Sequence, residues 1–226
     1  TRRDQGPFTG QASQFLVVGP FGDVGDHFVG VTYGPELQFP ALGSELPGRA
    51  VTAKVRTLVR PPNYRTMGLA NPARDLDGVY YALHRVEVAT AMSAFLEVDC
   101  GGEYQVFVDG AEVLRVQPWL QPGPQRRYIA LQLPAGPHET LVKTCTADRH
   151  AVALRWVDAE GTTIAAITEV RAEVPLQPIL ARATRETTPF VTALDVFARA
   201  ANAAGATASV RIAALRCAES YDANLQ

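Results

Sequence analysis

Residues 95–113, FLEVDCGGEYQVFVDGAEV, decide the fold of this chain. Apolar side chains occupy every second position, with Leu96, Val98 and Cys100 before Gly101-Gly102, and Tyr104, Val106 and Val108 after it. A period of two is typical of a β-strand with two unlike faces. Glycine supplies the positive φ that a tight turn requires. We therefore expect a β-hairpin at Gly101-Gly102 and a second tight turn at Asp109-Gly110.

Short segments of the same kind lie on both sides of this stretch. They are residues 15–18, 51–59, 79–88, 129–133, 139–145, 151–157 and 162–170. Glycine and proline punctuate the gaps, which are mostly too short for the crossovers that parallel strands need. The pattern predicts a mainly β fold, an antiparallel jelly-roll-type β-sandwich.

The character of the sequence changes after Glu173. Pro175 and Pro178 indicate a linker, and alanine becomes frequent from Thr188 onward. Thr188 suits a helix N-cap and Pro189 the first helical position. Two apolar stripes follow at helical spacing: Phe190, Leu194, Phe197 and Ala201, then Val210, Ala214, Cys217 and Tyr221.

The sequence therefore predicts two parts, a sandwich over residues 1–172 and a linker with a short α-helical hairpin over residues 173–226. Two helices alone bury little apolar surface. We expect the hairpin either to pack on the sandwich or to begin a helical repeat array.

Composition and charge exclude several classes of function. Of 226 residues, 47% are hydrophobic, and 21 basic against 23 acidic residues give a net charge of -2. No block of like charge forms a surface for nucleic acid or anionic lipid. No apolar run approaches the roughly 20 residues of a membrane span.

Catalytic motifs are also missing from the sequence. It contains no GxSxG, no HExxH and no glycine-rich phosphate loop before a helix. His84 alternates with Val86 and Val88, which favours a buried, hydrogen-bonded histidine over a catalytic base. We therefore expect no enzymatic activity and no cofactor beyond a structural calcium ion.

A sugar site needs aromatic faces and hydrogen-bonding groups on a rigid frame. Trp119 lies in a proline-bounded loop and is the first candidate platform, with Tyr33 and Tyr128 as others. Arg126 and Arg127 are candidate donors. The alternative for Trp119 is that it closes one end of the sandwich.

Acidic residues in the glycine-rich segment are candidate metal ligands. Asp23, Asp26 and Glu36 offer the oxygen ligands that calcium prefers. The alternative is that they are solvated loop residues.

Three cysteines occur, of which Cys100 and Cys145 each end a predicted strand. A disulfide between them would stabilise the fold by roughly 4 kcal/mol in the chain-entropy model. The alternative is that these two and Cys217 are small buried thiols.

Six strings of sequence resemble one family. They are FLVVGPF (15–21), YGPE (33–36), YYALHRVEV (80–88), LPAGPHETLVKTC (133–145) and LRWVDAEG (154–161), together with residues 95–113. They resemble the galactose-binding-like β-sandwich at the start of large bacterial tetratricopeptide-repeat proteins, some of which carry transglutaminase-like domains. The wider class includes carbohydrate-binding modules and members with a structural calcium.

The resemblance implies a non-enzymatic binding or scaffolding domain of a larger exported bacterial protein, periplasmic or secreted. Its expected partner is another protein or the chain's own downstream domains. The alternative is a carbohydrate-binding module that uses a loop aromatic patch around Trp119. Neither nucleic acid nor a membrane span is expected.

Overall fold

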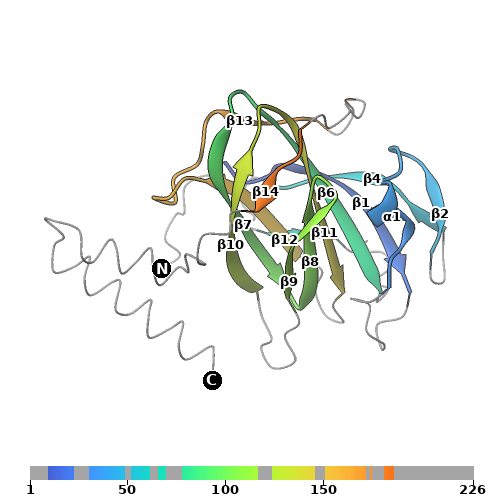
Figure 1. Cartoon of the computed structure of the whole chain (residues 1–226). Helices are drawn as coiled ribbons and strands as arrows, with labels where there is room; N and C mark the ends of the chain where they lie inside the picture. Colours follow the sequence, from blue (N-terminus) through green and yellow to red (C-terminus); the bar gives the residue numbers. More distant parts are fainter. Residues whose placement is uncertain are drawn as a thin grey trace, which may run out of the picture.

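A computed structural model describes residues 10–22, 31–48, 52–61, 66–69, 78–116, 124–145, 151–171, 174 and 181–185 (Figure 1). The elements are β1 (Gln14–Phe21), α1 (Gly34–Leu37), β2 (Glu45–Pro47), β3 (Thr52–Lys54), β4 (Arg56–Val59), β5 (Met67–Gly68), β6 (Val79–Val88), β7 (Met92–Gly101), β8 (Glu103–Val108), β9 (Ala111–Val116), β10 (Pro124–Leu133), β11 (Gly136–Cys145), β12 (Ala151–Val157), β13 (Ile167–Glu169) and β14 (Thr184–Arg185).

Two antiparallel sheets form the layers of a β-sandwich. The seven-stranded sheet has the order β4-β1-β6-β11-β8-β9, with β13 also paired to β6. The five-stranded sheet has the order β14-β10-β7-β12-β5, and β2 and β3 form a separate small sheet. From β6 to β12 the chain changes sheet at every connection except β8 to β9, an alternation typical of a jelly roll. The predicted mainly β, antiparallel sandwich is confirmed.

Apolar side chains from both sheets form the core between the layers. On β7 the inward positions are Leu96, Val98 and Cys100, and on β8 they are Tyr104, Val106 and Val108, all buried. Trp156 on β12 belongs to the same cluster. The alternation seen in the sequence therefore identified the inward face of each strand correctly.

The predicted hairpin at Gly101-Gly102 is wrong. β7 pairs with β10 and β12 in one sheet, whereas β8 pairs with β11 and β9 in the other. Gly102, with φ 71°, is the turn at which the chain passes between the layers. The second predicted turn is confirmed: Asp109 and Gly110, with φ 51° and 80°, join β8 to β9 as a two-residue hairpin loop.

Several predicted strand ends shift. β1 continues through the cis Gly19-Pro20 bond to Phe21, with a change of register after Val18. The segment 51–59 is divided at Val55 into β3 and β4, and of 162–170 only Ile167–Glu169 forms a strand.

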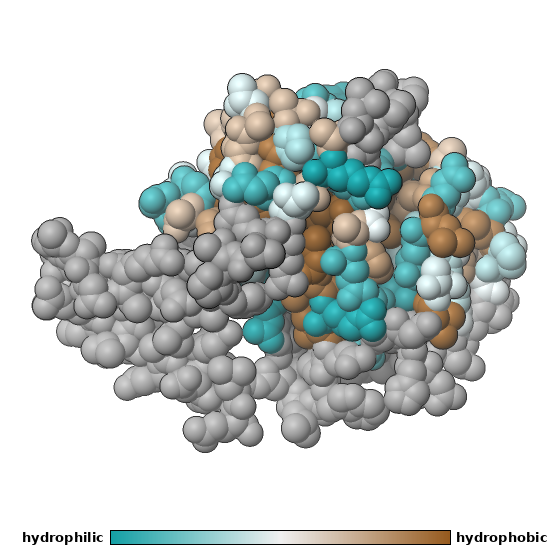
Figure 2. All heavy atoms as spheres, viewed as in Figure 1, coloured by the Kyte–Doolittle hydropathy of each residue, from teal (hydrophilic) through white to brown (hydrophobic). Residues whose placement is uncertain are grey.

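Residues 31–48 and 52–55 pack on the outer face of the seven-stranded sheet. They contribute to a second apolar group, the outer cluster, which contains Leu16, Val18, Phe21, Phe39, Ala53, Val55, Val79, Tyr81, Leu83, Leu141 and Cys145. Figure 2 shows apolar side chains at the surface near α1 and β2, where Leu37 is largely exposed.

The predicted helical hairpin lies outside the described residues. Thr184–Arg185, which the sequence analysis placed in the linker, adds a strand to the five-stranded sheet by pairing with β10. No helix in the described part of the chain is long and apolar enough to cross a membrane.

Candidate functional site

One row of outward side chains crosses the seven-stranded sheet from an apolar to a charged end. Across β1, β6, β11, β8 and β9, the residues opposite one another are Val18, Tyr81, Lys143, Gln105 and Arg115. Residues directly opposite on one face are close enough for their side chains to interact. The charged end lies on β8 and β9, beyond the apolar outer cluster.

A buried ammonium group holds residues 31–36 against this row. Lys143 Nζ donates to Glu36 Oε1 at 2.8 Å and to the Val31 carbonyl at 2.6 Å. The Tyr81 hydroxyl donates to the same Glu36 oxygen at 2.5 Å. Burial and this hydrogen bond raise the pKa of Tyr81, so its hydroxyl stays protonated. Lys143 is fully buried, and ion pairing compensates for its loss of hydration.

Local sequence explains why Glu36 is in place. α1 carries Pro35 in its first turn, and Glu36 is the third helical residue. A glutamate there reaches back to the N-cap, and Glu36 Oε1 accepts the Tyr33 backbone N–H at 3.3 Å. The Tyr33 ring lies over Lys143, with Nζ 5.6 Å from the ring centroid.

The other end of the row is a partly exposed ion pair. Arg115 donates from Nε to Glu112 Oε1 at 2.8 Å and from Nη2 to Glu112 Oε2 at 2.6 Å. Gln105 Nε2 donates to Glu112 Oε2 at 2.9 Å. The hydrogen bonds from Arg115, assisted by Gln105 and the charge of Lys143, hold the pKa of Glu112 below its usual value. Glu112 is therefore an ionised acceptor.

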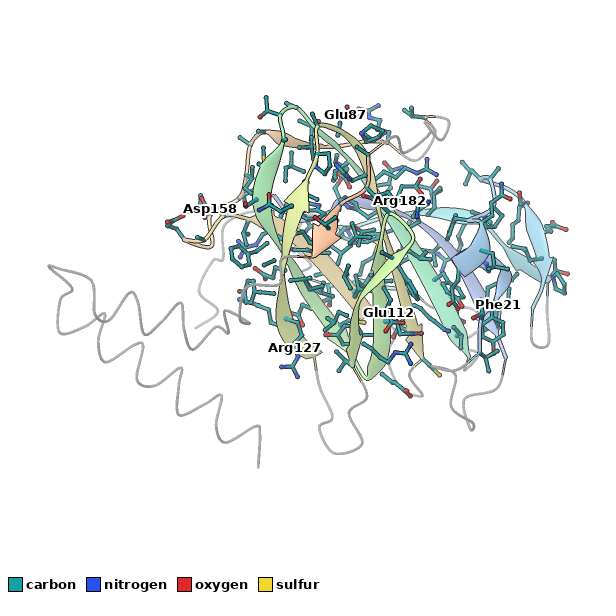
Figure 3. The ribbon with its side chains drawn as sticks, in the orientation of Figure 1. Phe21, Glu87, Glu112, Arg127, Asp158 and Arg182 are labelled. Atoms are coloured by element: carbon teal, nitrogen blue, oxygen red, sulfur yellow. The ribbon has the colours of Figure 1, made fainter. Side chains whose placement is uncertain are left out.

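We call the residues Glu36, Lys143, Gln105, Glu112 and Arg115 the polar strip. Two acidic and two basic side chains give it no net charge. Tyr33 and Phe107 are partly buried against the adjoining outer cluster. In Figure 3, Glu112 lies on the β9 side of the sheet and Phe21 on the β1 side. The strip combines fixed donors, fixed acceptors and aromatic surface.

The structure brings together only some of the predicted site residues. Tyr33 and Glu36 lie at the polar strip. Arg126 and Tyr128 lie on the outer face of the five-stranded sheet, where Arg126 Nε is 3.1 Å from Glu97 Oε1. Arg127, on the opposite face of β10, lies beside the Tyr104 hydroxyl. The five predicted ligand-binding residues therefore do not form one site, and Trp119 lies outside the described residues.

The predicted calcium site remains a prediction. Glu36 Oε1 already accepts hydrogen bonds from Tyr81 and Lys143. The described residues contain no group of three or more His, Cys, Asp and Glu side chains suited to a metal. Asp23 and Asp26 lie outside the described part of the chain.

The predicted disulfide is wrong. Cys100 and Cys145 are not bonded to each other. Cys100 belongs to the core between the sheets, whereas Cys145 belongs to the outer cluster, so their side chains lie on opposite sides of the seven-stranded sheet. Burial raises the pKa of Cys100 to about 12, so it stays a thiol.

His84 is buried, as the sequence indicated. Its Nε2 lies 3.1 Å from Glu169 Oε1, and the same oxygen accepts the backbone N–H groups of Ser13 and Gln14 at 2.9 Å each. Glu169 thereby joins the start of β1 to β13. We infer a structural role for this pair.

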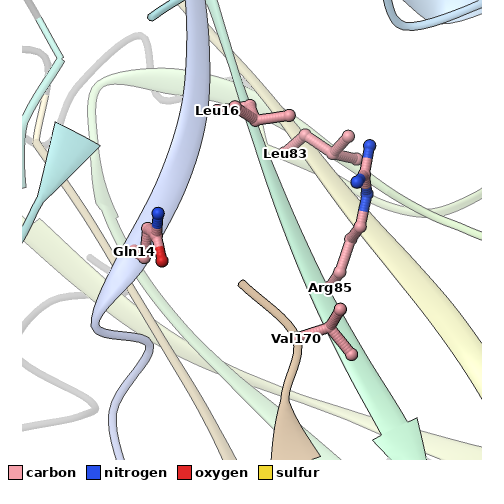
Figure 4. A pocket seen from close by; sticks show the side chains of 5 residues that line it. All are labelled: Gln14, Leu16, Leu83, Arg85 and Val170. Atoms are coloured by element: carbon pink, nitrogen blue, oxygen red, sulfur yellow. The ribbon is translucent and has the colours of Figure 1, made fainter. Parts of the chain in front are cut away.

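A shallow hollow lies on the outer face of the seven-stranded sheet (Figure 4). Its lining residues are Gln14, Leu16, Leu83, Arg85 and Val170, and its cavity volume is about 10 Å³, roughly the space of one water molecule. Ligand pockets usually enclose about 300–1,000 Å³. Arg85 also donates to Glu139 at 3.0 Å and to the Val174 carbonyl at 3.1 Å. The hollow is therefore a weaker candidate than the polar strip.

Sequence reasoning missed a buried Asp109–His138 pair. His138 Nδ1 lies 2.7 Å from Asp109 Oδ2, and His138 Nε2 lies 2.8 Å from the Pro134 carbonyl. Both ring nitrogens face acceptors, so the ring is an imidazolium that donates twice. Burial alone would lower the pKa of His138, but these two hydrogen bonds and the Asp109 charge raise it.

Asp109 also accepts the backbone N–H groups of Glu139 at 2.9 Å and Ala183 at 2.7 Å. It therefore joins the β8–β9 turn to β11 and to residues 181–185. The sequence contains one signal for this position. His138 alternates with Thr140 and Val142, which places it on the inward face of β11.

The chain is only distantly similar to known proteins. No protein-family model matches the chain, and no curated protein matches it. A family 35 carbohydrate binding module from an environmental isolate is 17% identical, over 40% of this chain and 69% of that one, with a TM-score of 0.31. A family 35 carbohydrate binding module from Clostridium thermocellum is 13% identical, over 41% and 85%, with a TM-score of 0.26.

A beta-glucosidase from Kluyveromyces marxianus in complex with glucose is 8% identical, over 69% of this chain and 18% of that one, with a TM-score of 0.36. The chain thus spans under a fifth of that enzyme. All three TM-scores lie below 0.5, and no conclusion about the ligand of this chain follows from them.

Proposed function

We propose that this chain is a non-catalytic binding domain that takes a neutral polyhydroxyl ligand, a glycan, at the polar strip. One observation carries the proposal. Glu112 is held by Arg115 and Gln105 at the β9 end of the seven-stranded sheet. Glu112 and Arg115 have side chains that are 33% and 46% exposed, so a ligand can reach both.

The chemistry of the strip suits hydroxyl groups. A sugar hydroxyl both donates and accepts, and an ionised glutamate beside a guanidinium group offers an acceptor and donors side by side. The strip carries no net charge, so it does not favour phosphate or another anion. The partly buried rings of Tyr33 and Phe107 offer carbon surface for the apolar face of a sugar ring.

The side chains are also fixed before a ligand arrives. Two hydrogen bonds from Arg115 and one from Gln105 restrict the rotamers of Glu112. Ordering a flexible side chain on binding costs about 0.5–1.5 kcal/mol, and a fixed side chain avoids this cost.

The same geometry argues against hydrolysis at this strip. A general acid needs a raised pKa, whereas the pKa of Glu112 is lowered by Arg115. The second carboxylate, Glu36, has a side chain only 11% exposed and bonds to Lys143 and Tyr81. The strip thus lacks an accessible proton donor paired with an accessible base.

The experiment is a glycan-array screen followed by calorimetry. Arg115→Ala and Glu112→Gln should weaken binding of any array hit about ten-fold, the equivalent of about 1.4 kcal/mol. Lys54→Ala is the matched control, because Lys54 lies on β3 and pairs with Glu45 rather than with a residue of the strip. Absence of any glycan hit, or equal binding by all three variants, would overturn the proposal.

Scaffolding within a larger exported bacterial protein is the second candidate, and it stays a prediction, as does the tetratricopeptide-repeat context. Residues 181–185 favour it, since β14 and the Ala183–Asp109 hydrogen bond fasten the chain that leads to residues 186–226.

A further inference from the structure

We propose that His138 is a proton-controlled latch for residues 181–185. While both ring nitrogens carry a proton, this segment stays on the edge of the five-stranded sheet, and loss of one proton releases it. The inference rests on contacts that the polar strip does not use, and it does not depend on glycan binding.

Three connections of the fold meet at this histidine. His138 Nδ1 lies 2.7 Å from Asp109 Oδ2 at the β8–β9 turn, and His138 Nε2 lies 2.8 Å from the Pro134 carbonyl, just after β10. The same Asp109 oxygen accepts the Ala183 N–H at 2.7 Å. A single carboxylate oxygen therefore links residues 181–185 to the protonation of the ring.

The ring needs both protons to make these contacts. A neutral imidazole has one N–H, so one of its nitrogens would point a lone pair at an acceptor. The side chains of His138 and Asp109 are both 0% exposed. Loss of the proton therefore leaves a buried carboxylate without a compensating charge, which is strongly unfavourable.

Residues 181–185 are the part of this site that opens most readily. The strands on the other sides of Asp109, β8 and β11, are each paired along both edges. In contrast, β14 has two residues and pairs with β10 at the edge of its sheet, and of residues 181–184 only Ala183 is buried. Short segments with few buried contacts open locally at a low free-energy cost. Water therefore reaches Asp109 at the smallest cost when this segment moves away.

The charged groups around the ring are acidic. They are Asp109 at the β8–β9 turn and Glu87 on β6. Glu139, the next residue on β11, points to the opposite face and pairs with Arg85. Arg182, on the segment itself, is exposed.

These neighbours set the direction of the pH dependence. Burial acts to lower the pKa of His138, whereas the hydrogen bonds to Asp109 and Pro134 and the two acidic charges act to raise it, and the net shift is upward. The closed arrangement therefore binds the proton more tightly than an open, hydrated one, whose histidine has its ordinary pKa of about 6.5. Opening becomes more favourable as pH rises from that value through the folded-state pKa.

The test is residue-resolved hydrogen exchange of the full chain by NMR, from about pH 6 to about pH 9. Each exchange rate is divided by the intrinsic rate at the same pH, so that the ratio reports only the opening of the structure. The Ala183 amide should lose protection about ten-fold or more as pH rises, in step with the titration of the His138 ring signals.

Low concentrations of urea separate local from global opening. Release of five residues exposes little surface, so exchange at Ala183 should not respond to urea. The Val98 amide, on the central strand β7, should exchange far more slowly and only through opening that urea promotes.

Variants then assign the effect to the buried pair. His138→Gln removes the titrating ring and should make the protection of Ala183 independent of pH. His84→Gln is the matched control, because His84 is a second buried histidine that pairs with Glu169, and it should leave the pH dependence unchanged. Asp109→Asn removes the buried charge while asparagine tolerates the positive φ of this position, and it should also abolish the pH dependence.

Three results would overturn the proposal. Protection of Ala183 that does not change with pH would show that His138 does not control the segment. Protection that responds to low urea in step with Val98 would show that the segment opens only with the whole sandwich. A pH dependence that survives both His138→Gln and Asp109→Asn would assign it to another group.

Discussion

The two outer faces of the sandwich bury charge in different ways. On the seven-stranded sheet, residues 31–48 and 52–55 pack on an apolar surface, and Lys143 binds Glu36 at its margin. On the five-stranded sheet, Glu97 is buried between Arg126 and Arg155. On the first face the ion pair fastens a separate segment, whereas on the second both partners belong to the sheet itself.

This difference shows why alternating charge is a poor guide to exposure. Lys143 and Glu97 each stand at an outward position between apolar inward residues, which in sequence resembles a solvated face. Both are nevertheless buried. Lys143 bonds to Val31 and Glu36, and Glu97 is paired with Arg126 and Arg155. Alternation along a strand assigns a side chain to one face of the sheet. The packing of distant segments decides whether that face is exposed to solvent.

The largest expected effect comes from removing the Lys143 ammonium group, which holds residues 31–36 against the seven-stranded sheet. Lys143→Met leaves Glu36 and the Val31 carbonyl without their buried ammonium partner, and should lower the free energy of unfolding by about 3 kcal/mol. Urea denaturation measures this, with Lys54→Met as control, since the 63% exposed Lys54–Glu45 pair should change stability by less than about 0.5 kcal/mol. Equal losses in the two variants would contradict the proposed role of Lys143.

A smaller loss of stability is expected from changing a carboxylate to an amide, and its size should differ between the two faces. Glu97→Gln weakens hydrogen bonds to two arginines in a buried setting and should cost about 2 kcal/mol of stability. Glu112→Gln changes a similar contact at a side chain that is 33% exposed, and should cost less than about 0.5 kcal/mol. A thermal melt of each variant gives the comparison, and a reversed order would contradict the deeper burial of Glu97.

The smallest expected effect is a pH dependence of the unfolding free energy that comes from His138. This residue pairs with Asp109, which also accepts the Ala183 N–H. The folded-state pKa of His138 is raised above the value in the unfolded chain, about 6.5. The folded protein therefore binds more protons than the unfolded chain in the interval between these pKa values, and its stability falls as pH rises through that interval.

Unfolding free energies measured from pH 6 upward should show this decline, and His138→Gln should lack it. A stability that rises over the same range would mean that His138 is neutral in the folded protein.

Much of the strand pattern could be predicted from sequence, since one face of most strands is buried in a single core. The connections between strands could not be predicted in the same way. Gly101-Gly102 and Asp109-Gly110 both offer positive φ, yet the first turn passes between layers and the second stays within one. What distinguishes them is that β7 pairs with β10 and β12, and no property of the turn itself reports pairing so far along the chain.

The candidate site was predicted in part. Tyr33 and Glu36 were identified from their residue types, but as separate sugar and metal candidates. Lys143, Gln105 and Arg115 were missed, because they come from three strands whose register places them in one row. That register depends on long-range pairing, which composition and periodicity do not contain.

The alternation of strands between layers also has a consequence for how the chain folds. From β6 to β12, only β8 and β9 pair with a neighbour in sequence, whereas β7 needs β10 and β12 on its two sides. Pairings between distant segments require loop closure first, which slows folding. During synthesis, β7 cannot be paired on both edges until Val157 has left the ribosome. One edge of β7 therefore stays unpaired while more than fifty further residues are added to the chain.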